Sequence, residues 1–96
     1  MRKNNTQKIG DVLKEYIEKM MIGRKLKEVS VINAWEDLLG KTVASRTTSI
    51  YIKNKVLFVH LSSSVVRNEL MMMRQEIINK LNEKAGEKII EKMILK

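Results

Sequence analysis

The sequence predicts a single two-layer α+β domain, with helices on one face of a three-stranded mixed sheet and the element order α-α-β-β-α-β. Three observations support this prediction. Apolar residues recur at three- and four-residue steps in three segments, which is the helical period. Two segments rich in β-branched and aromatic residues flank a short turn, as the strands of a hairpin do. The length of 96 residues is that of one domain.

The first two predicted helices span residues 7–22 and 27–39. Gly23 stands where a glycine would end the first helix, and Gly40 stands in the same position for the second. Trp35 lies in the middle of the second apolar stripe, which predicts a large core anchor. The first stripe consists of Ile9, Val12, Leu13, Tyr16, Ile17 and Met20. Residues 1–6 are predicted to be disordered.

A β-hairpin is predicted at residues 43–52 and 56–62. A two-residue turn at Asn54 and Lys55 suits this site, because Asn tolerates the positive φ of the first turn position. The resulting pairs are Lys53–Val56, then Ile52–Leu57, Ile50–Val59 and Thr48–Leu61 on an apolar face, and Tyr51–Phe58 and Ser49–His60 on the opposite face. A slip by one residue would exchange the two faces.

A third helix is predicted over residues 65–84, followed by a strand over residues 90–95. Ser62, Ser63 and Ser64 supply an N-cap candidate, and Gly86 ends the helix. The stripe of this helix is Val66, Leu70, Met73, Ile77 and Leu81, widened by Met71 and Met72. A third strand stabilises the sheet and would run parallel to its neighbour through a right-handed crossover. The predicted core includes Trp35, Ile50, Val59, Leu61 and Leu70.

Composition excludes several classes of function. The chain has no Cys, so it forms no disulfide, thiolate zinc site or cysteine nucleophile. His60 is the only His and has no motif partner for a triad or a metal site, and there is no Gly-rich phosphate loop. We therefore expect no catalytic residue, metal, cofactor or small-molecule substrate. No apolar run is long enough to span a membrane, and we expect a cytoplasmic protein without a membrane partner.

The net charge of +8 suggests an anionic partner. No acidic residue lies between Asp37 and Glu69, a window that contains the hairpin. Flat rings beside cations suit single-stranded nucleic acid, but Tyr51 and Phe58 are more typical of an ordinary cross-strand pair that only stabilises the hairpin. The predicted nucleic-acid site comprises Lys41, Arg46, Lys53, Lys55, Arg67, Tyr51 and Phe58, with a secondary basic patch of Arg24, Lys25 and Lys27.

An ordered set of short motifs resembles the DciA-like family. The motifs are Ala34-Trp35-Glu36 with Gly40, Val43-Ala44 with Thr47, Leu57-x-Val59, Ser62-Ser63-Ser64, Glu69-Leu70, Leu81-Asn82 and Gly86. The sequence from the serine run to Leu70 is similar to that of short members of the family from Bacteroidetes-type bacteria. This sequence has Val65 where many members have Trp, and it lacks the Pro of the first strand, the long tail beyond the domain and the K-homology Gly-x-x-Gly clamp.

The resemblance implies a K-homology-like fold, DNA binding and contact with the hexameric replicative helicase. The leading hypothesis is therefore a non-enzymatic accessory protein of DNA replication that binds single-stranded or structured DNA and loads the helicase. One alternative is an RNA- or ribosome-associated K-homology-like module, which would prefer structured RNA to DNA. Another is a protein-interaction domain with an acidic partner, which would show no salt-sensitive binding to polynucleotides.

Overall fold

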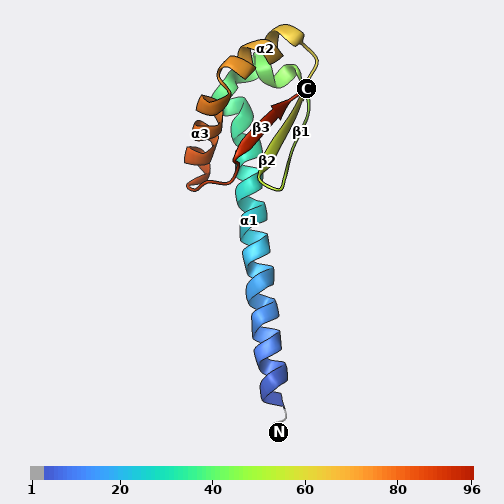
Figure 1. The fold of residues 1–96 in the computed structure, drawn as a ribbon, viewed down its shortest axis with the longest axis vertical. Helices are drawn as coiled ribbons and strands as arrows, with labels where there is room; N and C mark the ends of the chain where they lie inside the picture. Colours follow the sequence, from blue (N-terminus) through green and yellow to red (C-terminus); the bar gives the residue numbers. More distant parts are fainter. Residues whose placement is uncertain (1–3) are drawn as a thin grey trace.

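The computed structural model describes the backbone of residues 4–96 and the side chains of residues 9–96. A long helix projects from a body built on a three-stranded sheet (Figure 1). The elements are α1 (Asn4–Ser45), β1 (Thr47–Lys53), β2 (Val56–Leu61), α2 (Ser64–Met72), α3 (Arg74–Ala85) and β3 (Lys92–Leu95). Strand β2 pairs antiparallel with β1 and parallel with β3. The α+β class and the mixed sheet are confirmed.

The predicted helices at 7–22 and 27–39 are one continuous helix, so the prediction of a break at Gly23 is wrong. A glycine inside a helix costs only about 1 kcal/mol. The apolar stripe keeps its 3.6-residue period across Gly23 and continues into the buried Val31 and Trp35. Residues 4–6, predicted to be disordered, belong to α1, and residues 1–3 lie outside the described part.

Helical geometry in α1 stops at Gly40, as predicted, because this residue has φ 89° and ψ 169°. Residues 43–45, predicted to begin the first strand, form a last turn of α1 instead. The Arg46 N–H donates to the Val43 carbonyl at 3.1 Å, and the Thr47 hydroxyl donates to the same oxygen at 2.8 Å. These two bonds close the turn and delay the strand to Thr47.

Replacing Gly40 with alanine should lower the free energy of unfolding by about 1–3 kcal/mol, because its φ and ψ belong to a region that only glycine adopts readily. Among the described residues no atom lies within 4 Å of a Cβ built there, so the cost is backbone strain alone. Chemical denaturation measures this loss. The control is Gly10→Ala in a regular part of the helix, which should not destabilise the protein. Equal midpoints for the two variants would contradict the prediction.

The hairpin register is confirmed from Lys53–Val56 to Ser49–His60. Asn54 (φ 52°) and Lys55 (φ 64°) both have the positive φ of a type I′ turn. The one error lies at the far end, where a bulge pairs Leu61 with Thr47 rather than with Thr48. There the Thr48 hydroxyl donates to the His60 carbonyl at 3.1 Å.

The single helix predicted at 65–84 is divided into α2 and α3 at Met73, whose φ is −108° and ψ 13°. The observed element order is therefore α-β-β-α-α-β. Ser63 is the N-cap, and its hydroxyl accepts from the Val66 N–H at 3.3 Å. Because of the change in direction, Leu70 and Ile77 both reach the core. Met73, predicted to be a core residue, is 45% exposed.

The core lies between α1, α2, α3 and the sheet face that carries Leu57 and Val59. The predicted core residues Trp35, Val59, Leu61 and Leu70 are buried, and Ile50 packs at the margin. The fully buried side chains are Leu57, Ile77, Leu81, Ile90, Val31 and Val59.

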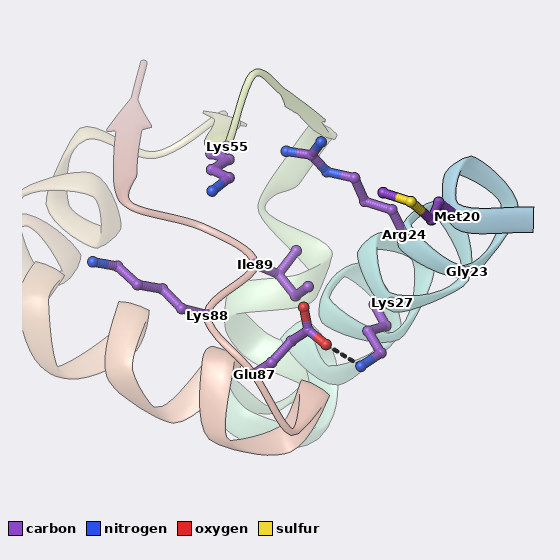
Figure 2. Close-up of a pocket in the computed structure, with 8 residues that line it drawn as sticks. All are labelled: Met20, Gly23, Arg24, Lys27, Lys55, Glu87, Lys88 and Ile89. Carbon is purple, nitrogen blue, oxygen red and sulfur yellow. Dashed lines mark hydrogen bonds and ion pairs between the residues drawn. The ribbon is translucent and has the colours of Figure 1, made fainter. Parts of the chain in front are cut away.

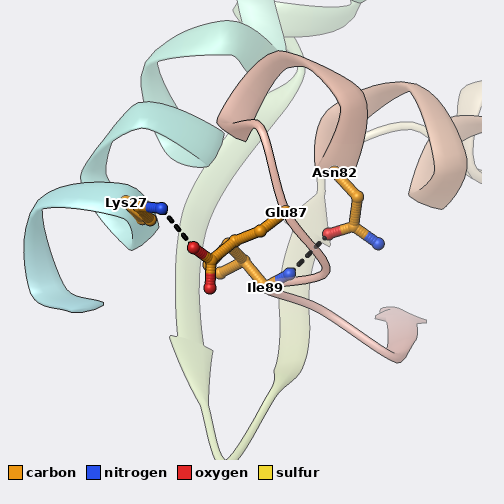
Figure 3. Close-up of polar contacts among 4 residues, drawn as sticks. All are labelled: Lys27, Asn82, Glu87 and Ile89. Carbon is orange, nitrogen blue, oxygen red and sulfur yellow. Dashed lines mark hydrogen bonds and ion pairs between the residues drawn. The ribbon is translucent and has the colours of Figure 1, made fainter. Parts of the chain in front are cut away.

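The connection from α3 to β3 is organised by one side chain. Gly86 ends α3 in the left-handed conformation (φ 83°, ψ 0°). Asn82 then accepts from the N–H groups of Ile89 and Ile90 at 2.9 and 3.0 Å and donates to the Ile90 carbonyl at 2.9 Å (Figure 3 shows the bond to Ile89). The chain then enters β3. The predicted third strand is confirmed, but it starts at Lys92 instead of residue 90.

Candidate nucleic-acid interface

The sheet face turned away from the core carries a row of flat rings. Strand residues alternate between the two faces, so Tyr51, Phe58 and His60 all lie opposite the buried Leu57 and Val59. The Tyr51 and Phe58 rings stack with centroids 5.0 Å apart and an angle of 16° between their planes. The Tyr51 and His60 centroids are 6.3 Å apart at 22°. We call this surface the open face.

Lysines flank the rings at one end of the open face. The register aligns Lys53, Val56 and Lys92 across the three strands, next to the row of Tyr51 and Phe58. Residues two apart on a strand are about 7 Å from each other along it. Both lysines are exposed. Sequence reasoning missed Lys92, because it lies far from the hairpin in the chain and only the parallel register of β3 brings it there.

A second basic surface lies where the projecting part of α1 meets the body. An open notch of about 400 Å³ is lined by Met20, Gly23, Arg24, Lys27, Lys55, Glu87, Lys88 and Ile89 (Figure 2). We call this surface the root notch. It brings together Lys55 of the predicted hairpin site with Arg24 and Lys27 of the predicted secondary patch. Lys25 lies beside Asn54 in an adjacent groove. Lys88, which no sequence motif indicated, completes the set of cations.

The remaining predicted cations, Lys41, Arg46 and Arg67, lie elsewhere. Arg46 precedes β1, and its carbonyl accepts from the N–H of Ser62 at 2.8 Å at the end of β2. The seven residues of β1 separate this end of the sheet from the hairpin tip by about 20 Å. Lys41 follows Gly40, and Arg67 lies in α2. The predicted site is therefore split between two ends of the sheet.

The acid-free sequence window between Asp37 and Glu69 suggested that the surface around the hairpin has no acidic residue. In the structure, two acidic residues from the C-terminal segment lie near it. Glu87 lines the root notch and forms an ion pair with Lys27 (Figure 2, Figure 3). The N–H of Glu91 donates to the Lys55 carbonyl at 2.7 Å, which places this acidic residue at the hairpin tip. Both partners of the ion pair are about half exposed, so the pair contributes little to stability. The prediction of an uninterrupted electropositive surface is wrong.

Nothing in the described part of the chain adds a metal or membrane site. Among residues 9–96, no three His, Asp or Glu side chains are grouped so that they could hold a metal ion. No described helix is long and apolar enough to cross a membrane. The open face offers rings on which a base can stack, and its lysines and those of the root notch attract anions.

Comparison with known proteins decides the family. The family model described as "Dna[CI] antecedent, DciA" matches residues 8–95. The chain belongs to the DciA family. The resemblance seen in the sequence motifs is thus confirmed over nearly the whole chain.

Two relatives support this assignment. A UPF0232 protein of Corynebacterium glutamicum (strain R) is 31% identical over 87 residues, which are 91% of this chain and 49% of that protein. An uncharacterized protein of Borreliella burgdorferi is 27% identical over 92 residues, which are 93% of this chain and 92% of that protein. The chain thus spans about half the length of the first DciA relative and nearly all of the second.

Proposed function

We propose that this chain is a cytoplasmic accessory protein of DNA replication that binds DNA and loads or operates the hexameric replicative helicase. The match to the DciA family over residues 8–95 is the observation that carries this proposal. The sheet with helices on one face supports the K-homology-like fold that the resemblance implies, but the sequence lacks the Gly-x-x-Gly clamp of that fold. DNA binding is therefore assigned to another surface.

The open face and the adjoining root notch are the surfaces we assign to DNA. Tyr51 is 43% exposed on the open face, so a base can stack on the exposed part of its ring beside Phe58 and His60. Lys53 and Lys92 then attract the neighbouring phosphates. Lys55 and Lys88 offer a continuation of this phosphate track into the root notch.

The phosphate contacts predict a change in salt dependence. Each contact with a single strand contributes about 0.7 to the slope of log affinity against log salt. The Lys53→Ala/Lys92→Ala variant should reduce this slope by about 1.4, provided that both lysines contact phosphate. Fluorescence anisotropy with a labelled single strand at three salt concentrations measures it. The matched control is Lys80→Ala/Lys84→Ala on the exposed side of α3, which should keep the wild-type slope. An unchanged slope in the first variant would remove the open face from the site.

Replacing an aromatic ring tests base stacking, which is separate from the attraction of phosphates. Tyr51→Ala should lower the affinity about 5- to 150-fold, the equivalent of ~1–3 kcal/mol for one stacked base, and leave the salt slope unchanged. Melting curves are the control. A fall in affinity that only parallels a fall in melting temperature would show that Tyr51 and Phe58 merely hold the hairpin together.

The helicase contact requires a separate experiment. Immobilised hexameric replicative helicase of the same organism should retain the purified chain after nuclease treatment. Loss of the complex on nuclease treatment would show that DNA alone bridged the two proteins, and the chain would then be a DNA-binding accessory.

Competition between single-stranded DNA and structured RNA distinguishes the replication role from an RNA-associated module, because only the latter predicts a preference for RNA.

A further inference from the structure

The root notch contains a glycine that the fold itself does not require. Gly23 lines the notch within the regular part of α1, and it does not have a positive φ. Among the described residues no atom lies within 4 Å of a Cβ built there, so close packing does not require a glycine either. A glycine inside a helix lowers the stability of that helix relative to alanine. What Gly23 provides is open space in the notch, which a side chain would fill.

The notch has the size and the composition of a site for a small anionic ligand. Its volume of about 400 Å³ lies within the range of small-molecule sites. Three segments that are distant in the sequence form its walls, namely α1, the hairpin turn and the loop between α3 and β3 (Figure 2). Met20 and Ile89 supply apolar surface, and four of the other lining residues are cations.

Three of these cations lie around the open space. The Arg24 guanidinium extends from α1 towards the hairpin that carries Lys55 (Figure 2). Lys27 forms the ion pair with Glu87, and Lys88 points away from that pair (Figure 2). In the described part of the chain, neither Arg24 nor Lys55 has a carboxylate within ion-pair distance. The three cations and the one carboxylate leave an excess of two positive charges.

We propose that the root notch binds a phosphate monoester, which is the terminal phosphate of a DNA strand or the phosphate of a free mononucleotide. A monoester carries a charge of about −1.5 to −2 at neutral pH, which balances the excess charge, whereas each phosphodiester inside a strand carries a single charge. The Arg24 guanidinium offers two parallel N–H donors to phosphate oxygens. For a strand end the inference rests on the proposed DNA binding, and for a mononucleotide it does not.

Glu87 is a competitor of the ligand within the chain itself. Its carboxylate already pairs with Lys27, so a phosphate that enters the notch competes for the same ammonium group. Both side chains are about half exposed, and an ion pair of this kind is weak and easily replaced. Removal of the Glu87 charge should therefore strengthen phosphate binding.

The first experiment compares strand ends. Three single strands of one sequence carry a 5′-phosphate, a 3′-phosphate or hydroxyl groups at both ends, each with an internal fluorophore. In fluorescence anisotropy, a strand whose terminal phosphate enters the notch should bind the full chain about tenfold more tightly than the hydroxyl strand. Titration calorimetry with thymidine 5′-monophosphate tests the free source of the same group.

Two glycine variants test whether the notch is the site. Gly23→Leu fills the open space with an uncharged side chain, so it should remove the advantage of the phosphorylated strand and the binding of the mononucleotide. The matched control Gly10→Leu makes the same change in α1 outside the notch and should behave like the wild type. Both variants replace a helical glycine with a strong helix former, so both should melt at or above the wild-type temperature. Melting curves thus exclude unfolding as the cause of a loss.

A variant of Glu87 should have the opposite effect. Glu87→Gln frees Lys27 and should strengthen binding of the phosphate probes up to about fivefold, the range of an exposed ion pair. The matched control Glu69→Gln changes the net charge equally, at an exposed position of α2 that does not line the notch. It should leave the advantage of the phosphorylated strand unchanged.

The outcomes separate the two sources of phosphate from each other and from the proposed function. A preference for one phosphorylated end assigns the notch to strand ends, and mononucleotide binding with equal affinities for the three strands assigns it to the free nucleotide. Equal affinities without mononucleotide binding, or a preference that persists in Gly23→Leu, would overturn the proposal. The affinity for the hydroxyl strand measures the proposed DNA binding, which succeeds or fails independently of the notch.

Discussion

Replacing Trp35 with alanine should lower the free energy of unfolding by about 3–5 kcal/mol. Trp35 is 3% exposed and lies where α1 meets the sheet. Its indole N–H donates to the Thr47 hydroxyl at 3.0 Å, which in turn donates to the Val43 carbonyl. The substitution therefore creates a large cavity and removes the bond that joins α1 to β1. For a domain of this size the loss approaches the whole stability.

Two variants separate the contributions at Trp35, each measured by denaturant titration. Trp35→Phe keeps most of the ring and removes the hydrogen bond to Thr47, so it should cost about 1–2 kcal/mol. Leu26→Ala is a control in the projecting part of α1, where Leu26 is 64% exposed, and should cost much less. A midpoint for Trp35→Ala close to that of Leu26→Ala would show that the core does not depend on this ring.

The hairpin was the most predictable part of the fold. The alternation of apolar and polar residues and the two turn residues Asn54 and Lys55 determine both faces at once, and a slip by one residue would bury the wrong set. Local sequence thus contains enough information for the register. It does not predict the bulge at Thr48, which adjoins Thr47. The Thr47 hydroxyl bonds to Trp35 and Val43, and the contact with the Trp35 side chain forms only in the folded domain.

The helices show where local signals fail. Gly23 is the residue type that often ends a helix, but it keeps the helical conformation. A glycine that ends a helix typically has positive φ. Gly40 and Gly86 do have positive φ. The sequence signal that distinguishes them is the apolar stripe, which continues in phase through Gly23. Following the phase rather than the glycine would have joined the two predicted helices and revealed that the stripe is longer than the body.

The candidate interface was predictable only within the hairpin. Tyr51, Phe58 and Lys53 are close in sequence, and the structure places them together on the open face. Lys92 and Lys88 come from the C-terminal segment and join through tertiary contacts. Neither the parallel register of β3 nor the path of the loop before it has a local sequence signal. The prediction of an acid-free surface was wrong for the same reason, because Glu87 and Glu91 of the C-terminal segment lie close to the hairpin.

Replacing Asn82 with alanine should lower the free energy of unfolding by about 2–4 kcal/mol. Asn82 makes three hydrogen bonds with the backbone of Ile89 and Ile90, and both of these residues are buried. Each bond contributes about 1 kcal/mol net, and a buried N–H that loses its acceptor costs about 1–3 kcal/mol. These bonds direct the chain from α3 into β3, so their loss also loosens the third strand.

The matched control is Asn79→Ala. Asn79 is exposed on the same helix, and among the described residues its side chain bonds only to that of Gln75, at 3.0 Å, so its loss should cost less than about 0.5 kcal/mol. Hydrogen exchange adds a local readout, because the amides of Ile89 and Ile90 should exchange faster in Asn82→Ala before the rest of the domain opens. Equal stability of the two variants, with unchanged exchange at these amides, would mean that the parallel pairing of β3 with β2 holds the loop without Asn82.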